Sequence, residues 1–166
     1  MNLYVAIPLL ALVAIMQSTL IPYLAVWGLK PDLMLLVIVS WTLLRGSGQG
    51  LLWSAMGGLL LDLLSSGPFG LCSVALVCVA ALTGLGEMNI FRLSLVLPLM
   101  AAALATICYD AILLLGLHLV GKPIIWADAL LRVIAPSIIV NVLVMPIVFG
   151  AMRWIHRRTG PEEISW

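Results

Sequence analysis

Two aspartates, Asp62 and Asp110, interrupt long apolar runs and are the side chains of this sequence best placed to do acid–base chemistry. An ionisable group inside an apolar segment costs about 2.5 to 3.5 kcal/mol on membrane-insertion scales, so each one needs a reason. A catalytic pair, as in intramembrane aspartyl proteases, would need further motif residues around each carboxylate. The neighbours of both aspartates are apolar or aromatic and supply none. The pair therefore does not indicate an enzyme.

Four polar side chains are expected at a similar depth, in the outer half of a bilayer, when the predicted helices are laid out at 1.5 Å per residue: Gln17, Asp62, Asp110 and Arg132. They could form a cluster that binds a substrate or a partner. They could equally pair their charges and only fix the packing of the helices. We expect Asp62 to lie beside a basic or hydrogen-bonding group, with Arg132, Lys30 and the Ser65-Ser66 turn as candidates.

The remaining reactive residue types are scattered. The three cysteines lie in apolar runs without CxxC spacing and are interpreted as packing residues, and the two histidines are isolated along the chain. We find no HExxH, GxSxG or P-loop motif. Asn141, in the middle of the last apolar stretch, is expected to bond to a neighbouring helix. The sequence predicts no catalytic residue, no cofactor and no metal site.

The composition indicates the kind of element that must position these residues. Of the 166 residues, 64% are hydrophobic and 9% are charged, whereas a soluble domain is typically about 25% charged. The formal net charge of +1 gives no basic surface for nucleic acid. We therefore predict an integral membrane protein with lipid as its main solvent and no soluble domain.

Charges, glycines and prolines divide the chain into six apolar stretches, at about 3–27, 32–45, 49–65, 69–86, 93–120 and 130–152. No strand-like alternation is present, so the prediction is all-α: one membrane domain over residues 1–166 with about six transmembrane helices. The second and third stretches are short for a hydrocarbon core of about 30 Å. A re-entrant hairpin at that point, leaving four full spans, is the alternative.

Basic residues predict the orientation. Arg153, His156, Arg157 and Arg158 follow the last stretch, and the excess of basic residues on cytoplasmic loops places this tail inside. An even number of spans then places both termini in the cytoplasm. Tryptophans near the predicted ends of the spans fit the aromatic belts of a membrane protein.

Small residues are the expected contact points between helices. Gly and Ala let two backbones approach closely without a ligand, and four of them fall in suitable places on the predicted helices: Gly57, Gly58, Ala80 and Gly84.

Two stretches in sequence order carry a family resemblance. Lys-Pro-Asp-Leu at 30–33 opens an apolar run that closes on Leu-Arg-Gly at 44–46, and residues 57–71 read Gly-Gly-Leu-Leu-Leu-Asp-Leu-Leu-Ser-Ser-Gly-Pro-Phe-Gly-Leu. This pattern resembles the rod shape-determining protein MreD family, whose members are short, nearly all-membrane chains. The family-like positions are Pro31, Asp32, Asp62, Gly67, Pro68 and Gly70.

The resemblance implies a non-enzymatic scaffold in the complex that directs lateral peptidoglycan synthesis and maintains rod shape. Its implied partners are MreC, the glycosyltransferase RodA, a class B penicillin-binding protein and, indirectly, MreB filaments. The implied fold is similar to the six-helix substrate-binding component of energy-coupling-factor vitamin transporters. A solute-binding transporter component is the alternative function, although a vitamin pocket should have several convergent polar or aromatic groups under a capping loop, and this chain offers few polar residues.

Overall fold

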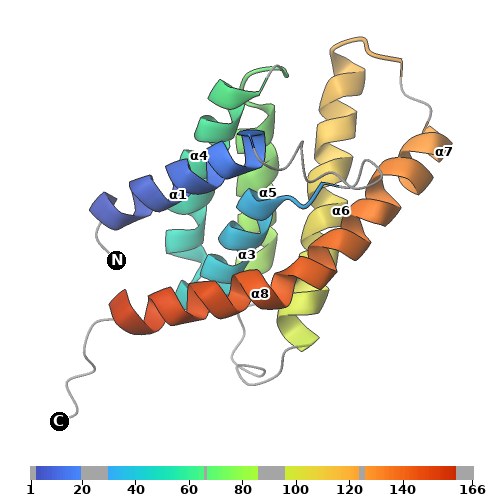
Figure 1. The fold of residues 1–166 in the computed structure, drawn as a ribbon. Helices are drawn as coiled ribbons and strands as arrows, with labels where there is room; N and C mark the ends of the chain where they lie inside the picture. Colours follow the sequence, from blue (N-terminus) through green and yellow to red (C-terminus); the bar gives the residue numbers. More distant parts are fainter. Residues whose placement is uncertain (1–2, 20–29, 66, 86–95, 124–125, 160–166) are drawn as a thin grey trace.

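The computed structural model describes residues 3–19, 30–65, 67–85, 96–123 and 126–159, and all regular structure within these ranges is helical (Figure 1). The prediction of an all-α fold is confirmed for this part of the chain. In chain order the elements are α1 (Leu3–Thr19), α3 (Leu33–Arg45), α4 (Ser47–Leu64), α5 (Leu71–Leu85), α6 (Val96–Leu119), α7 (Trp126–Ala129), the π-helical segment η1 (Leu130–Ile134) and α8 (Ala135–Thr159).

The helices follow the apolar stretches of the sequence, with differences at their ends. The stretches at 3–27 and 93–120 include residues 20–27 and 93–95, which lie outside the described residues. The last helix continues seven residues past the predicted end at 152, to Thr159. Its last turns therefore include the basic residues that were expected to follow the span.

Two helical segments, Val96–Leu119 and Leu130–Arg158, are long and apolar enough to cross a membrane by length and composition. The others are shorter: α3 has 13 residues and α5 has 15. At 1.5 Å per residue α3 is about 20 Å long, less than the roughly 30 Å of a hydrocarbon core. The number of complete spans stays a prediction.

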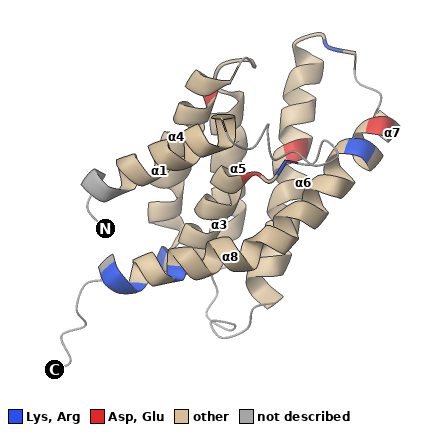
Figure 2. Ribbon diagram, viewed as in Figure 1, with Lys and Arg blue, Asp and Glu red and all other residues tan. Residues whose placement is uncertain are grey.

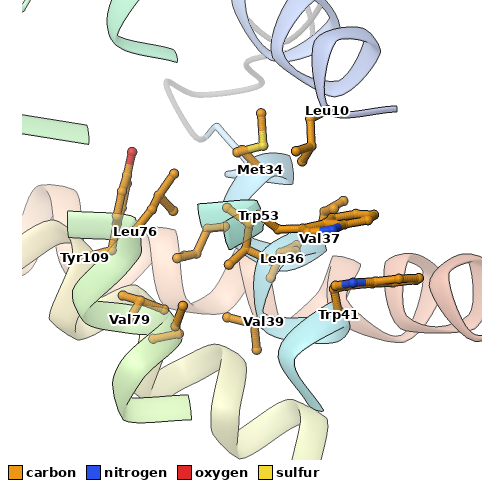
Figure 3. Close-up of a cluster of buried hydrophobic side chains, with 14 of the residues drawn as sticks. Leu10, Met34, Leu36, Val37, Val39, Trp41, Trp53, Leu76, Val79 and Tyr109 are labelled. Carbon is orange, nitrogen blue, oxygen red and sulfur yellow. The ribbon is translucent and has the colours of Figure 1, made fainter. Parts of the chain in front are cut away.

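Helix α3 forms the centre of the described structure. All nine residues from Met34 to Thr42 are buried, on every side of the helix. A helix that is apolar all round is stable when other helices enclose it, and α3 contacts α1, α4, α5, α6 and α8. Figure 3 shows the buried cluster around it, where the rings of Trp41 and Trp53 stack with their centroids 4.3 Å apart.

Helices α4 and α5 form the closest helix pair. A Cβ atom at Gly58 would collide with the backbone of Ser73 on α5, and a Cβ atom at Gly84 would collide with Ser47 on α4. On another side of α4, a Cβ atom at Gly57 would lie only 2.8 Å from the sulfur of Met34. These glycines let α4 approach both α5 and α3, and Ala80 is fully buried in the same core.

Segment η1 and helix α8 form one long, largely exposed rod that crosses in front of α3 and α6 (Figure 1). Large apolar side chains point outward along it, including Leu131, Leu143 and Ile147, each at least 70% exposed. Apolar surface of this extent is unstable in water and requires lipid or a partner protein. Figure 2 shows basic residues gathered at the C-terminal end of α8, beside the end of α3.

Candidate functional site

A chain of polar side chains joins four helices in the middle of the protein. The Gln17 side chain of α1 donates a hydrogen bond to Asp32 Oδ1 (3.2 Å) and accepts one from the backbone N–H of Met34 (2.8 Å). The backbone N–H of Asp32, at the start of α3, donates to Asn141 Oδ1 of α8 (2.9 Å), and Asn141 Nδ2 donates to Thr106 Oγ1 of α6 (3.0 Å). This network positions the first turn of α3 against α1, α6 and α8.

A pocket of about 350 Å³ lies beside this network, bounded by α1, the start of α3, the end of α4, α5 and α6. Its polar lining includes the side chains of Gln17, Lys30, Asp32, Ser65 and Tyr109, and leucines of α4 form its apolar wall. Figure 3 shows Tyr109 at the edge of the buried cluster with its hydroxyl pointing away from the apolar side chains. The pocket therefore presents a cation, a carboxylate, an amide and hydroxyls in one space.

Asp62 has a different role: it binds the beginning of the next helix. Its Oδ1 accepts a hydrogen bond from the backbone N–H of Cys72 (3.0 Å), and its Oδ2 accepts from the backbone N–H (3.1 Å) and the hydroxyl (2.6 Å) of Ser73. The first N–H groups of a helix have no partner within the helix and attract negative charge. A hydrogen-bonding partner was expected for this carboxylate, and the partner is the N-terminus of α5. Of the candidates from the sequence, Arg132, Lys30 and Ser65 do not fill that role, and Ser66 lies outside the described residues.

Three family-like positions explain how Asp62 reaches α5. Gly67 donates its backbone N–H to Ser65 Oγ (3.1 Å), Pro68 accepts from the N–H of Leu71 (3.3 Å), and Gly70 has φ of 91°. A positive φ favours glycine, because a Cβ atom would clash in that conformation. The turn directs the chain back so that the first N–H groups of α5 face the carboxylate on α4. The Gly-Pro-x-Gly motif and Asp62 thus form one structural unit.

Asp110 is buried on α6, only 6% exposed, and its Oδ2 atom has no hydrogen-bond partner among the described residues. Its carboxyl is near enough to Asp32 for the two groups to interact electrostatically, and the Ser137 side chain of α8 faces it. Asp110 therefore lies next to the polar network. An acceptor that is buried without a partner is costly.

Arg132 lies elsewhere, on the exposed surface of η1. Its Nε is 3.5 Å from Asp128 Oδ1, one turn away, and the two side chains are 80% and 56% exposed. The structure therefore distributes the four residues of the expected outer cluster over separate places. Gln17 and Asp110 lie at the polar network, Asp62 lies at the start of α5, and Arg132 lies on the surface.

A second cluster lies at the other end of α3. Arg45 Nε donates to His156 Nδ1 of α8 (2.7 Å), the guanidinium lies 5.3 Å from the centre of the Trp41 ring, and Trp41 stacks on Trp53 of α4. This contact holds the end of α3 to α4 and to the last turns of α8. Sequence reasoning interpreted His156 as isolated and did not predict this contact, which spans 111 residues.

Sequence reasoning did not assign Asp32 or Thr106 to the network. Asp32 entered only as a family-like position, although a charged residue between two apolar stretches was a usable signal. Thr106 is an ordinary residue in an apolar helix, and only the fold reveals its contact with Asn141. Asn141 was expected to bond to a neighbouring helix, and its bond to α6 confirms this expectation.

An apolar groove of about 560 Å³ runs between α5 and α6, near the end of α3. Its small residues on α6 recur at spacings of three or four, on one face of the helix: Ala101, Ala105, Cys108 and Ala111. Leu82, Met100 and Leu104 form the more exposed rim. The groove is a surface on which another apolar helix or chain could approach closely.

The described residues include no group of three or more His, Cys, Asp or Glu side chains that could hold a metal ion. Their polar side chains mainly bond helices to one another, while large apolar side chains cover the outside. Together with the two long apolar helices, this arrangement is typical of a helical membrane protein in which polar contacts organise the bundle.

A comparison with models of protein families identifies the family of this protein. The model of the rod shape-determining protein MreD matches residues 1–155, nearly the whole chain. The protein belongs to this family, as its motif residues predicted. The comparisons with curated proteins and with solved structures found no match.

Proposed function

We propose that this protein is a non-enzymatic membrane scaffold of the bacterial cell-wall elongation complex, which binds MreC and supports lateral peptidoglycan synthesis. The family match over residues 1–155 carries the proposal. RodA, a class B penicillin-binding protein and, indirectly, MreB filaments complete the proposed assembly. The proposed fold is a six-span bundle similar to the substrate-binding component of energy-coupling-factor transporters.

The proposed location is the cytoplasmic membrane, with several spans and both termini in the cytoplasm. The distribution of charge supports this orientation. Arg45 hydrogen-bonds to His156, which lies among Arg153, Arg157 and Arg158 in the last turns of α8, so these basic groups share one end of the bundle. Clustered basic residues mark the cytoplasmic side of a membrane protein. Reporter fusions at the two ends of the chain test this, and reporters on opposite sides of the membrane would contradict it.

Partner binding within the membrane is proposed to depend on close packing rather than on charge. The polar groups of the described helices largely serve internal contacts, as in the bonds from Gln17 to Asp32 and from Asn141 to Thr106. Large apolar side chains cover the exposed faces of α6 and α8. Because lipid tails are as apolar as leucine, helices in a bilayer associate through close packing of small residues and through hydrogen bonds.

The groove between α5 and α6 offers this packing. It combines a floor of small side chains with an apolar rim, and its volume of about 560 Å³ leaves room for side chains of a partner's helix. Gly57 and Gly58, by contrast, are buried and already pack against α3 and α5, respectively. We propose that the single span of MreC contacts the groove.

The direct test is co-purification. The full chain, tagged at its cytoplasmic C-terminus and co-expressed with MreC, should retain MreC through purification in mild detergent, while a tagged membrane protein of similar size should not. In a rod-shaped bacterium lacking its own family member, the chain should restore rod shape. Absence of MreC from the purified material together with failure to restore shape would overturn the proposal.

Matched variants test the groove itself. Ala101→Leu combined with Ala111→Leu fills the groove and should reduce MreC recovery by roughly tenfold or more, a loss of about 1.4 kcal/mol. Ala151→Leu makes the same chemical change on an exposed part of α8 and should leave recovery unchanged. Arg157→Ala with Arg158→Ala should also leave the complex intact. If removal of the tail charges abolishes the complex and the filled groove still binds, the contact lies on the cytoplasmic face.

A further inference from the structure

The pocket beside the polar network differs in chemistry from two other pockets of the described structure. The groove between α5 and α6 and a pocket of about 360 Å³ between α6, η1 and α8 are lined almost entirely by apolar side chains. The pocket of about 350 Å³ at Lys30 and Asp32 combines polar groups with an apolar wall. Its size falls within the range of about 300 to 1,000 Å³ that is typical of small-ligand sites.

Opposite charges line this pocket. Lys30 is exposed and forms no ion pair with the described part of the chain. Asp32 is half-buried, and the bond from Gln17 to its Oδ1 holds its carboxylate in place. The pocket therefore presents one acidic and one basic group at the start of α3, and the two also interact electrostatically with each other.

Asp110 adds a second acidic group behind the first. It interacts electrostatically with Asp32, and its Oδ2 atom is buried without a hydrogen-bond partner among the described residues. Asp110 does not line the pocket, but the Asp32 carboxyl in front of it favours a ligand that brings a positive charge and N–H donors. Lys30 favours a ligand that also brings a negative charge.

Apolar side chains of α4 form one wall of the pocket. Leu61 and Leu64 of α4 line the pocket, and Leu64 is 49% exposed. The neighbouring Leu63 and Phe69 are 71% and 69% exposed. A ligand with a charged head in the pocket would therefore find room for apolar chains along the end of α4. This combination fits a membrane lipid better than a wholly polar solute.

We propose that the pocket binds the head group of a phospholipid that carries both a phosphate and a primary ammonium. The ammonium lies at Asp32, the phosphate lies at Lys30, and the acyl chains follow the leucines of α4. A purely anionic head would face the Asp32 carboxyl, and a quaternary ammonium could not donate hydrogen bonds to it. This inference goes beyond partner binding and does not depend on it.

A lipid titration of the purified full chain tests the class of ligand. Phosphatidylethanolamine, phosphatidylcholine and phosphatidylglycerol with identical acyl chains are added to delipidated protein in detergent, and binding is followed by native mass spectrometry. Phosphatidylethanolamine should bind roughly tenfold more tightly than the other two, because only its head group offers N–H donors and a phosphate together. Equal affinity for all three would overturn the proposal.

Soluble phosphoethanolamine tests whether the ligand of the pocket is a lipid or a soluble molecule. It carries the same two charged groups without acyl chains, so its binding should be at least tenfold weaker than that of the lipid. Binding of phosphoethanolamine that is as tight as binding of the lipid would overturn the lipid assignment and favour a solute-binding function.

Matched charge variants locate the site. Lys30→Gln and Asp32→Asn should each weaken phosphatidylethanolamine binding roughly tenfold. Asparagine keeps an oxygen acceptor for Gln17, so the network is retained. Lys122→Gln and Asp128→Asn make the same changes at exposed positions outside the pocket and should bind as the wild type. If Asp32→Asn does not purify as a monodisperse species, Lys30→Gln decides, and wild-type affinity of Lys30→Gln would overturn the proposal.

Discussion

Helices α3 and α8 are both largely apolar, but α3 is buried whereas much of α8 is exposed. Nine consecutive residues of α3 are buried, so other helices of the same protein enclose it. Helix α8 is almost twice as long, yet Leu143 and Ile147 are 70% and 74% exposed, while Asn141 and Met145 on the same helix are fully buried. The difference teaches that hydrophobicity alone does not identify the neighbour of a helix in this chain. Other helices of the protein surround α3. Helix α8 packs one side against the protein and exposes its other side.

Substitution of a tryptophan should distinguish the two helices most strongly. Trp41 on α3 is fully buried and stacks on Trp53, so Trp41→Ala should lower the free energy of unfolding by about 3 kcal/mol or more, through the cavity that it leaves. Trp154 on α8 is 58% exposed, and Trp154→Ala should cost about 1 kcal/mol or less. Unfolding in mixed micelles containing sodium dodecyl sulfate measures both. Equal losses would show that α3 is not enclosed as described.

A similar contrast between a buried and an exposed contact exists between Asp62 and Asp128. Asp62→Leu removes the acceptor for two N–H groups and one hydroxyl at the start of α5, and should lower the free energy of unfolding by about 2 to 3 kcal/mol. Asp128→Leu removes only an exposed pair with Arg132 and should cost less than about 0.5 kcal/mol. The same micelle experiment measures the two variants. A neutral Asp62→Leu would contradict a stabilising role for this contact.

Asn141 tests the protein-facing side of α8. Asn141→Leu removes the bonds to the backbone of Asp32 and to Thr106, which should destabilise the protein by about 1 kcal/mol. Thr106→Val removes one of the two bonds and should cost about half as much. Combining the two substitutions should cost less than the sum, since both remove the same bond. Additive losses would show that the two side chains do not interact.

The smallest effect is expected on the outward face of α8. Leu143→Ala removes a side chain that is 70% exposed and should change the free energy of unfolding by less than about 0.5 kcal/mol. Leu36→Ala, at a fully buried position of α3, is its control and should cost about 2 kcal/mol or more. A large loss from Leu143→Ala in the protein alone would show that this face of α8 packs against protein, as in a dimer.

The sequence predicted the helical, apolar character of the chain and the need of Asp62 for a partner, because both follow from local composition and from the cost of burying charge. It did not predict the partner of Asp62, since this depends on the turn that brings α5 back to α4. The contact from Asp32 to Asn141 spans 109 residues, and that between Arg45 and His156 spans 111. Contacts of this kind are set by the relative positions of whole helices, which local patterns do not contain.

The Asp62 contact also has a consequence for biosynthesis. Its partners Cys72 and Ser73 follow only 10 and 11 residues later, so the contact closes within one helical hairpin. In the proposed six-span bundle, an unpaired carboxylate would oppose the entry of α4 into the bilayer by about 2.5 to 3.5 kcal/mol. Once α5 has left the ribosome, hydrogen bonds from its first N–H groups to Asp62 offset much of that energetic cost. We expect the translocon to release α4 and α5 into the membrane as a pair, with α4 retained until the serine of the next helix arrives.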